Sequence, residues 1–138
     1  MENQLKDIRR TLVLKAPIQK VWDAVATAEG LEAWFMPNDF KPEIGHEFHV
    51  DAGPYGMSPC KVTELNPPHR LAFDWAKDWK LTFELKDLGE ETELTFVHSG
   101  WDDAKETEFG QPHSVVRGIM KEGWEGKLTQ SLTRLVEG

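Results

Sequence analysis

The sequence is poor in cysteine and has no long apolar run, and each shortage excludes a class of protein. Its only cysteine, Cys60, cannot form an internal disulfide or join other cysteines around a metal. No uninterrupted apolar run approaches the length of a membrane-spanning helix. The first residues lack the charged-then-apolar pattern of a secretion signal. We therefore expect a cytoplasmic protein, because a chain without disulfides suits a reducing compartment.

The sequence also has few positively charged residues relative to negatively charged ones. The 138 residues include 16 Lys and Arg against 24 Asp and Glu, which gives a net charge of -8 at pH 7. An acidic surface repels nucleic acid and anionic membranes, so we expect neither as a partner. The length fits a single domain, residues 1–138, with a core of ordinary size.

Motifs for catalysis or metal binding are missing as well. His46 and His49 are three residues apart, which on a strand places them on opposite faces and makes a poor metal pair. Residues 53–56 lack the strand-to-helix context of a phosphate-binding loop. No paired carboxylates share an apolar face, and no nucleophile–histidine spacing stands out. We expect no metal, no cofactor and no catalytic residue, and the residues favour a protein that is not an enzyme.

The longest amphipathic pattern lies near the end of the chain and predicts one helix over residues 112–136. Apolar residues recur there at every fourth position, at Val116, Met120, Trp124, Leu128 and Leu132. A step of four exceeds 3.6 residues per turn, so this row of side chains winds slowly around the axis. Pro112 fits a first-turn position. Gly118, Gly123 and Gly126 are either tolerated in a plain core helix or allow the sheet backbone or a ligand to approach closely.

Between residues 43 and 99 the period of the pattern changes from 3.6 to 2, which predicts a meander of antiparallel strands with one apolar face. Another strand is expected over 8–14. Two short helices are expected after it, the second capped by Thr27. The predicted fold class is α+β, a curved antiparallel sheet wrapped around a long C-terminal helix. That helix is the only long apolar stripe available to cover the sheet.

Landmarks along nearly the whole chain resemble a known family. In chain order they are Ala16-Pro17, Val21-Trp22, Gly30-Leu31, Trp34-Phe35, Val62, Glu64, Pro67-Pro68, Leu71, Trp75, His98-Ser99-Gly100, Gly123-Trp124, Leu128 and Leu132. Their order resembles the family related to the C-terminal domain of the Hsp90 ATPase activator, within the START/Bet v 1-like (SRPBCC) superfamily. The resemblance implies a helix-grip fold, often built around an apolar cavity. It does not fix a function, because the superfamily includes lipid binders, cyclases and ring-hydroxylase subunits.

The alternation also predicts which side chains face the C-terminal helix. The candidate ligand-binding residues are Phe48, Val62, Phe73, Trp75, Phe83, Phe96, His98, Val116, Met120 and Trp124. His98 is the polar member, and it is either a structural histidine with its hydrogen bonds satisfied or a ligand contact. Residues 100–111 are either a solvated linker or a segment that folds over an open end of the structure.

Two classes of function remain open at this point. In the first, the domain binds a small apolar or aromatic molecule, lipid-like or polyketide-like, between sheet and helix without catalysis. In the second, it is a protein-interaction module of the Hsp90 co-chaperone or stress-response type, with a chaperone or another protein as partner. A cyclase-like enzyme is a weaker third alternative, since no acid–base pair can be named. The first two classes differ in whether the tryptophans leave the space open or fill it.

Overall fold

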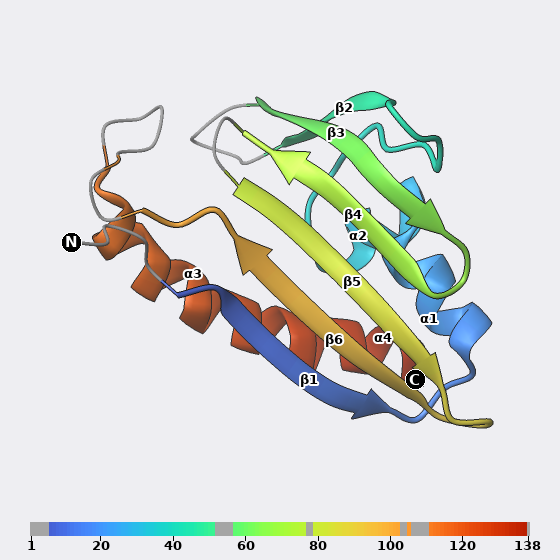
Figure 1. Ribbon diagram of the computed structural model, residues 1–138. Coiled ribbons are helices and arrows are strands. Elements are labelled where there is room, and N and C mark those ends of the chain that lie inside the picture. The colour runs from blue at the N-terminus through green and yellow to red at the C-terminus, as the bar shows by residue number, and fades with distance from the viewer. Residues whose placement is uncertain (1–5, 52–56, 77–78, 103–104, 106–110, 138) are drawn as a thin grey trace.

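The computed structural model describes residues 6–51, 57–76, 79–102, 105 and 111–137 and shows a six-stranded antiparallel sheet with helices on one face (Figure 1). The strands are β1 (Ile8–Leu14), β2 (Glu47–Asp51), β3 (Met57–Asn66), β4 (Arg70–Trp75), β5 (Trp79–Asp87) and β6 (Thr92–Ser99). Their order in the sheet is β1-β6-β5-β4-β3-β2. The predicted α+β helix-grip fold is therefore confirmed.

The strands form where polar and apolar residues alternate, and the alternation assigns each side chain to a face. Phe73, Phe83 and Phe96 are all buried on the inner face, with Phe83 directly opposite Phe96 in the register of β5 and β6. On the outer face, Arg70 forms ion pairs with Glu64 and Glu84. The register shifts between Val62 and Glu64, and such a bulge increases the local twist and curvature of a sheet.

The C-terminal helix is continuous but not uniform. It consists of α3 (His113–Gly126), a π-helical segment η2 (Lys127–Leu132) and α4 (Thr133–Glu137). Its buried residues continue at steps of four, at Trp124, Leu128, Leu132 and Val136. A π turn holds more residues than an α turn, so η2 keeps this row on the side facing the sheet. Pro112 precedes the first turn as the N-cap, one position earlier than predicted, because its ψ of 137° is extended.

The C-terminal helix shares the inner face of the sheet with two short helices. A single helix about 10 Å wide is too narrow for six strands spaced about 4.8 Å apart. The remaining surface is covered by α1 (Ile18–Val25) and α2 (Ala28–Trp34), which lie behind β3, β4 and β5 (Figure 1). Trp34 at the end of α2 packs edge-on against Phe83, with ring centroids 6.1 Å apart. The long helix therefore covers part of the inner face, and the two short helices cover the rest.

Glycines play different parts in α2 and in α3. Thr27 caps α2 as predicted, accepting a hydrogen bond of 2.9 Å from the Gly30 backbone N–H. A Cβ on Gly30 would lie 2.7 Å from the Ala24 Cα, so the close packing of α2 on α1 requires this glycine. An added Cβ on Gly118, Gly123 or Gly126 would meet nothing within 4 Å. These three glycines are therefore not points of close approach to the sheet backbone.

No helix within the described parts of the chain is both long enough and apolar enough to cross a membrane.

Candidate functional site

Eight rings gather between the sheet and the C-terminal helix at the end of the sheet where β4 and β6 finish and β5 begins. We call them the aromatic cluster, and they are Phe35, Trp75, Trp79, Phe96, His98, Trp101, His113 and Trp124. Trp124 of α3 lies between Phe96 of the sheet and Phe35, with ring centroids 4.6 and 5.3 Å away. Around these residues the tryptophans fill the space by direct ring contact.

His98 is the centre of the cluster and has no exposed surface. Its ring centroid lies 4.6 Å from that of Trp101 and 5.0 Å from that of Trp79. The Trp124 indole N–H donates to His98 Nδ1 over 2.9 Å, and the Trp101 indole N–H donates to the His98 carbonyl over 3.0 Å. Because an indole N–H can only donate, Nδ1 must be the unprotonated nitrogen, and the proton of the neutral ring is on Nε2.

Burial keeps this histidine neutral. Desolvation, and secondly the neighbouring His113, lower the pKa of His98 to about 3. A protonated ring would also point a second N–H at the Trp124 indole and break that hydrogen bond. The geometry and the depressed pKa therefore agree on one neutral tautomer.

Three buried nitrogen atoms of the cluster have no hydrogen-bond partner in the described structure. They are the indole Nε1 atoms of Trp75 and Trp79 and the His98 Nε2. All three are N–H donors, given the tautomer of His98. A buried donor without an acceptor costs about 1–3 kcal/mol, so the cluster is less stable than a fully satisfied or fully apolar core. A group that supplied an acceptor here would recover part of that cost.

The structure brings the predicted site residues together in two connected groups. Trp75, Phe96, His98 and Trp124 belong to the aromatic cluster. Phe48, Phe73 and Phe83 continue across the sheet, with ring centroids 5.1 Å apart for Phe48 and Phe73 and 6.2 Å for Phe73 and Phe83.

The other three predicted site residues have no ring in this series. Val62 is buried opposite Phe73 in the register of β3 and β4. Val116 and Met120 on α3 are partly buried against the same core. All ten predicted side chains thus lie in or against one core, although the inner positions are closely packed.

Sequence reasoning missed four members of the cluster. Trp79 shares the alternation of Phe83, so the signal for it was present in the pattern. Phe35 follows the end of α2, although the apolar pattern of the second short helix runs through it, and Trp101 follows β6 outside any periodic segment. Trp101 is nevertheless only 1% exposed. Residues 100–111 were expected to be either a linker or a segment that folds over an open end, and most of them lie outside the described residues. From this segment the structure describes, among others, Trp101, Asp102, Lys105 and Gln111.

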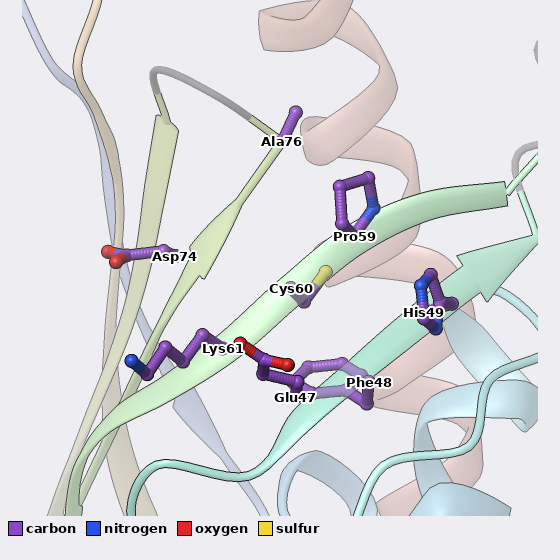
Figure 2. A pocket seen from close by; sticks show the side chains of 8 residues that line it. All are labelled: Glu47, Phe48, His49, Pro59, Cys60, Lys61, Asp74 and Ala76. Atoms are coloured by element: carbon purple, nitrogen blue, oxygen red, sulfur yellow. The ribbon is translucent and has the colours of Figure 1, made fainter.

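A hollow lies on the β2–β4 side of the sheet, away from the aromatic cluster, and Figure 2 shows its lining. Its volume is about 310 Å³, and its walls are Glu47, Phe48, His49, Pro59, Cys60, Lys61, Asp74 and Ala76. Of the predicted site residues it includes only Phe48. Burial, reinforced by Asp39 and Asp74, raises the pKa of the Cys60 thiol, so this cysteine is not a reactive thiolate. The hollow therefore offers mixed surface charges and no thiolate nucleophile.

Comparisons with solved structures agree with this architecture. The solution structure of a Bacillus halodurans protein is 42% identical, covers 97% of this chain and 99% of its own, and has a TM-score of 0.87. A protein from the dynemicin biosynthetic locus is 26% identical, covers 95% of this chain but 47% of its own, and has a TM-score of 0.75. The Aha1 dimer from Colwellia psychrerythraea is 20% identical over 96% of this chain and 97% of its own, with a TM-score of 0.70, and shows likeness of fold alone.

No curated protein gives a significant match to the sequence. A family model does, and it is described as activator of Hsp90 ATPase homolog 1-like protein. The match runs over residues 15–137, from the end of β1 through α4, and so includes every member of the aromatic cluster. The helix-grip fold and the span of this match lead to one conclusion: the chain belongs to the family of activator of Hsp90 ATPase homolog 1-like proteins.

Proposed function

We propose that this domain binds a small apolar or aromatic molecule between its sheet and its C-terminal helix, without catalysing a reaction on it. The observation that carries the proposal is the aromatic cluster, whose unsatisfied donors are confined to one group of rings. Aromatic walls with a few directional polar groups are typical of small-molecule sites. A polyketide-like or lipid-like ligand is the class we favour, since a relative of similar fold is encoded in the dynemicin biosynthetic locus.

Entry of a ligand requires the packed rings to separate, and α3 is the element best placed to allow this. Val116 and Met120 are only partly buried, and Val115 and Ile119 beside them are 53% and 65% exposed. Between its two buried residues, His113 and Trp124, α3 therefore packs against the core only through partly buried side chains. A modest displacement of this middle part would open the side of the cluster next to Met120.

The test is a thermal-shift screen of cytosolic metabolites and lipids, repeated on two tryptophan variants of α3. A ligand present at a hundred times its dissociation constant should stabilise the fold by about 2.7 kcal/mol. Met120→Trp places a bulkier ring against the core and should abolish that shift. Ile119→Trp is the matched control, because its side chain points to solvent and should leave binding unchanged. Unchanged affinity in Met120→Trp would place the site elsewhere.

A protein partner is a second candidate, and two observations favour it. The tryptophans fill the space between sheet and helix by direct ring contact, as expected for an interaction module without a ligand cavity. Val115 and Ile119 expose apolar surface on the same side of α3, on a chain with a net charge of -8. A chaperone or another protein with an apolar, basic surface would fit such a face. Loss of a pull-down partner in Ile119→Asp but not in Met120→Trp would favour this function over ligand binding. We place either function in the cytoplasm, where a single unpaired cysteine persists without oxidation.

A further inference from the structure

The three unsatisfied donors restrict the chemistry of what the site can hold. Among the described residues, no other buried side-chain nitrogen or oxygen lacks a hydrogen-bond partner. All three belong to rings in mutual contact. The centroid of Trp79 lies 5.2 Å from that of Trp75 and 5.0 Å from that of His98, and Trp75 and His98 are 5.6 Å apart. Independent packing defects would be scattered through the core, whereas these three donors lie on rings that touch one another, so a single bound group could reach more than one of them.

Three of the other four indoles have a hydrogen-bond acceptor, so the lack of an acceptor is not a general property of the core. The N–H of Trp34 donates to the Ala24 carbonyl over 2.7 Å. Those of Trp101 and Trp124 both donate to His98, one to its carbonyl and one to its Nδ1. The bond from Trp124 has a further effect, since it turns the Nε2 proton of His98 into a donor beside Trp75 and Trp79.

We propose that the ligand carries a neutral hydrogen-bond-accepting oxygen, such as the carbonyl of an aromatic ketone, and that the N–H groups of His98, Trp75 and Trp79 recognise this oxygen. The inference rests on the proposed function and specifies the ligand class. An oxygen with two lone pairs accepts from two donors of the three at once, whereas an amine would place further donors against donors. The flat walls of the cluster suit the aromatic part of such a molecule.

The preference for a neutral oxygen follows from the charges around the cluster. A buried carboxylate needs a cation or several charge-assisted hydrogen bonds. The only titratable rings of the cluster are His98 and His113, and His98 is held neutral by its burial. The chain as a whole carries a net charge of -8, which further disfavours an anion.

The experiment compares ligand pairs that differ only in the acceptor. The probes are 1-indanone against indane and 9-fluorenone against fluorene, with 9-fluorenecarboxylate as the anionic counterpart. The readouts are thermal stabilisation and the ¹⁵N-edited NMR signals of the six indole N–H groups, which are assigned by single Trp→Phe variants. The ketone of at least one pair should bind at least tenfold more tightly than its hydrocarbon, which corresponds to about 1.4 kcal/mol. The Trp75 and Trp79 signals should move downfield, while that of Trp34 stays in place.

Substitutions test the same donors from the protein side. Trp79→Phe keeps an aromatic ring but removes one donor, and should reduce the preference for the ketone over the hydrocarbon severalfold. Trp34→Phe is the matched control, because its N–H already has a partner, and it should leave the preference unchanged. If Trp79→Phe fails to fold, the indole N–H signals of Trp75 and Trp79 in the natural protein still test whether these groups bind the oxygen.

Each remaining outcome has a distinct meaning. Equal binding of ketone and hydrocarbon would overturn the acceptor inference and leave the proposed apolar site standing. Binding of no member of either pair would remove both proposals. Tighter binding of 9-fluorenecarboxylate than of 9-fluorenone would overturn the neutral class in favour of an anion. Ketone binding without a change in the Trp75 and Trp79 signals would show that other groups recognise the oxygen, and would also overturn the inference.

Discussion

Lowering the pH from 6.5 to 4.5 should reduce the free energy of unfolding by about 2.3 kcal/mol through His98 alone. In the unfolded chain this histidine takes up a proton near its ordinary pKa of 6.5, whereas in the fold its pKa is lowered to about 3. The unfolded state therefore binds more protons between these two values. Within this window, lowering the pH must reduce the free energy of unfolding by up to about 1.4 kcal/mol per pH unit. Above the window the free energy of unfolding must level off.

The lower limit of pH 4.5 is chosen so that the effect of His98 on the free energy of unfolding can be measured apart from that of the carboxylates. Hydrogen bonds from the His49 backbone and from Arg70 lower the pKa of Asp39 and of Glu64, respectively, below their ordinary values of 3.8 and 4.5. Their contributions are lost only as the pH falls below those ordinary values. Between pH 6.5 and 4.5 these two carboxylates consequently contribute little to the change in the free energy of unfolding. His98 dominates the dependence of that free energy on pH.

The assay is urea unfolding followed by tryptophan emission at half-unit pH steps. His98→Phe should unfold more easily at pH 7, because the Trp124 indole loses its acceptor. Its stability should nevertheless vary less between pH 6.5 and 4.5 than that of the natural protein. His49→Gln is the control, since His49 is exposed, and it should retain the full slope. The same slope in the natural protein and in His98→Phe would refute the assignment of a buried neutral histidine.

Two further predictions concern packing. Phe96→Ala should cost about 3–5 kcal/mol in urea unfolding, because Phe96 is fully buried against Trp124, and a loss below about 1 kcal/mol would show that its ring borders a cavity. Gly118→Ala should raise stability by up to about 1 kcal/mol, since the added methyl group meets open space on a helix. Gly30→Ala should instead lower the melting temperature, because its methyl group would collide with the backbone of α1 at Ala24. Equal effects of the two alanines would contradict the described packing of α2 on α1.

Much of the fold could be predicted from sequence because its signals are local. Alternation alone identified the inner face with Phe73, Phe83 and Phe96, and the expected strand over 8–14 coincides with β1. Thr27 was identified as a cap because a side-chain oxygen before a helix satisfies a free backbone N–H. These features need no knowledge of the rest of the chain.

The detail of the site depends on contacts that no period encodes. The hydrogen bond between Trp124 and His98 depends on the position of α3 relative to β6. That position results from the packing of many residues together. Trp101 lies outside any periodic segment, so nothing in its sequence neighbourhood reveals that it is buried. The apolar pattern through Phe35 predicts burial but not which rings it contacts. The orphaned donors of Trp75 and Trp79 become visible only when the surroundings of each nitrogen are known.

The π-helical segment η2 determines how the chain tolerates changes in length. Trp124, Leu128, Leu132 and Val136 contact the core at intervals of four residues. Deleting one residue between Leu128 and Leu132 would give intervals of four, three and four, which a regular α-helix presents on one face. Inserting one residue there would give an interval of five and rotate Leu132 and Val136 away from the sheet. Homologous chains can therefore shorten this helix by one residue while keeping the same core, whereas lengthening it requires a compensating change elsewhere.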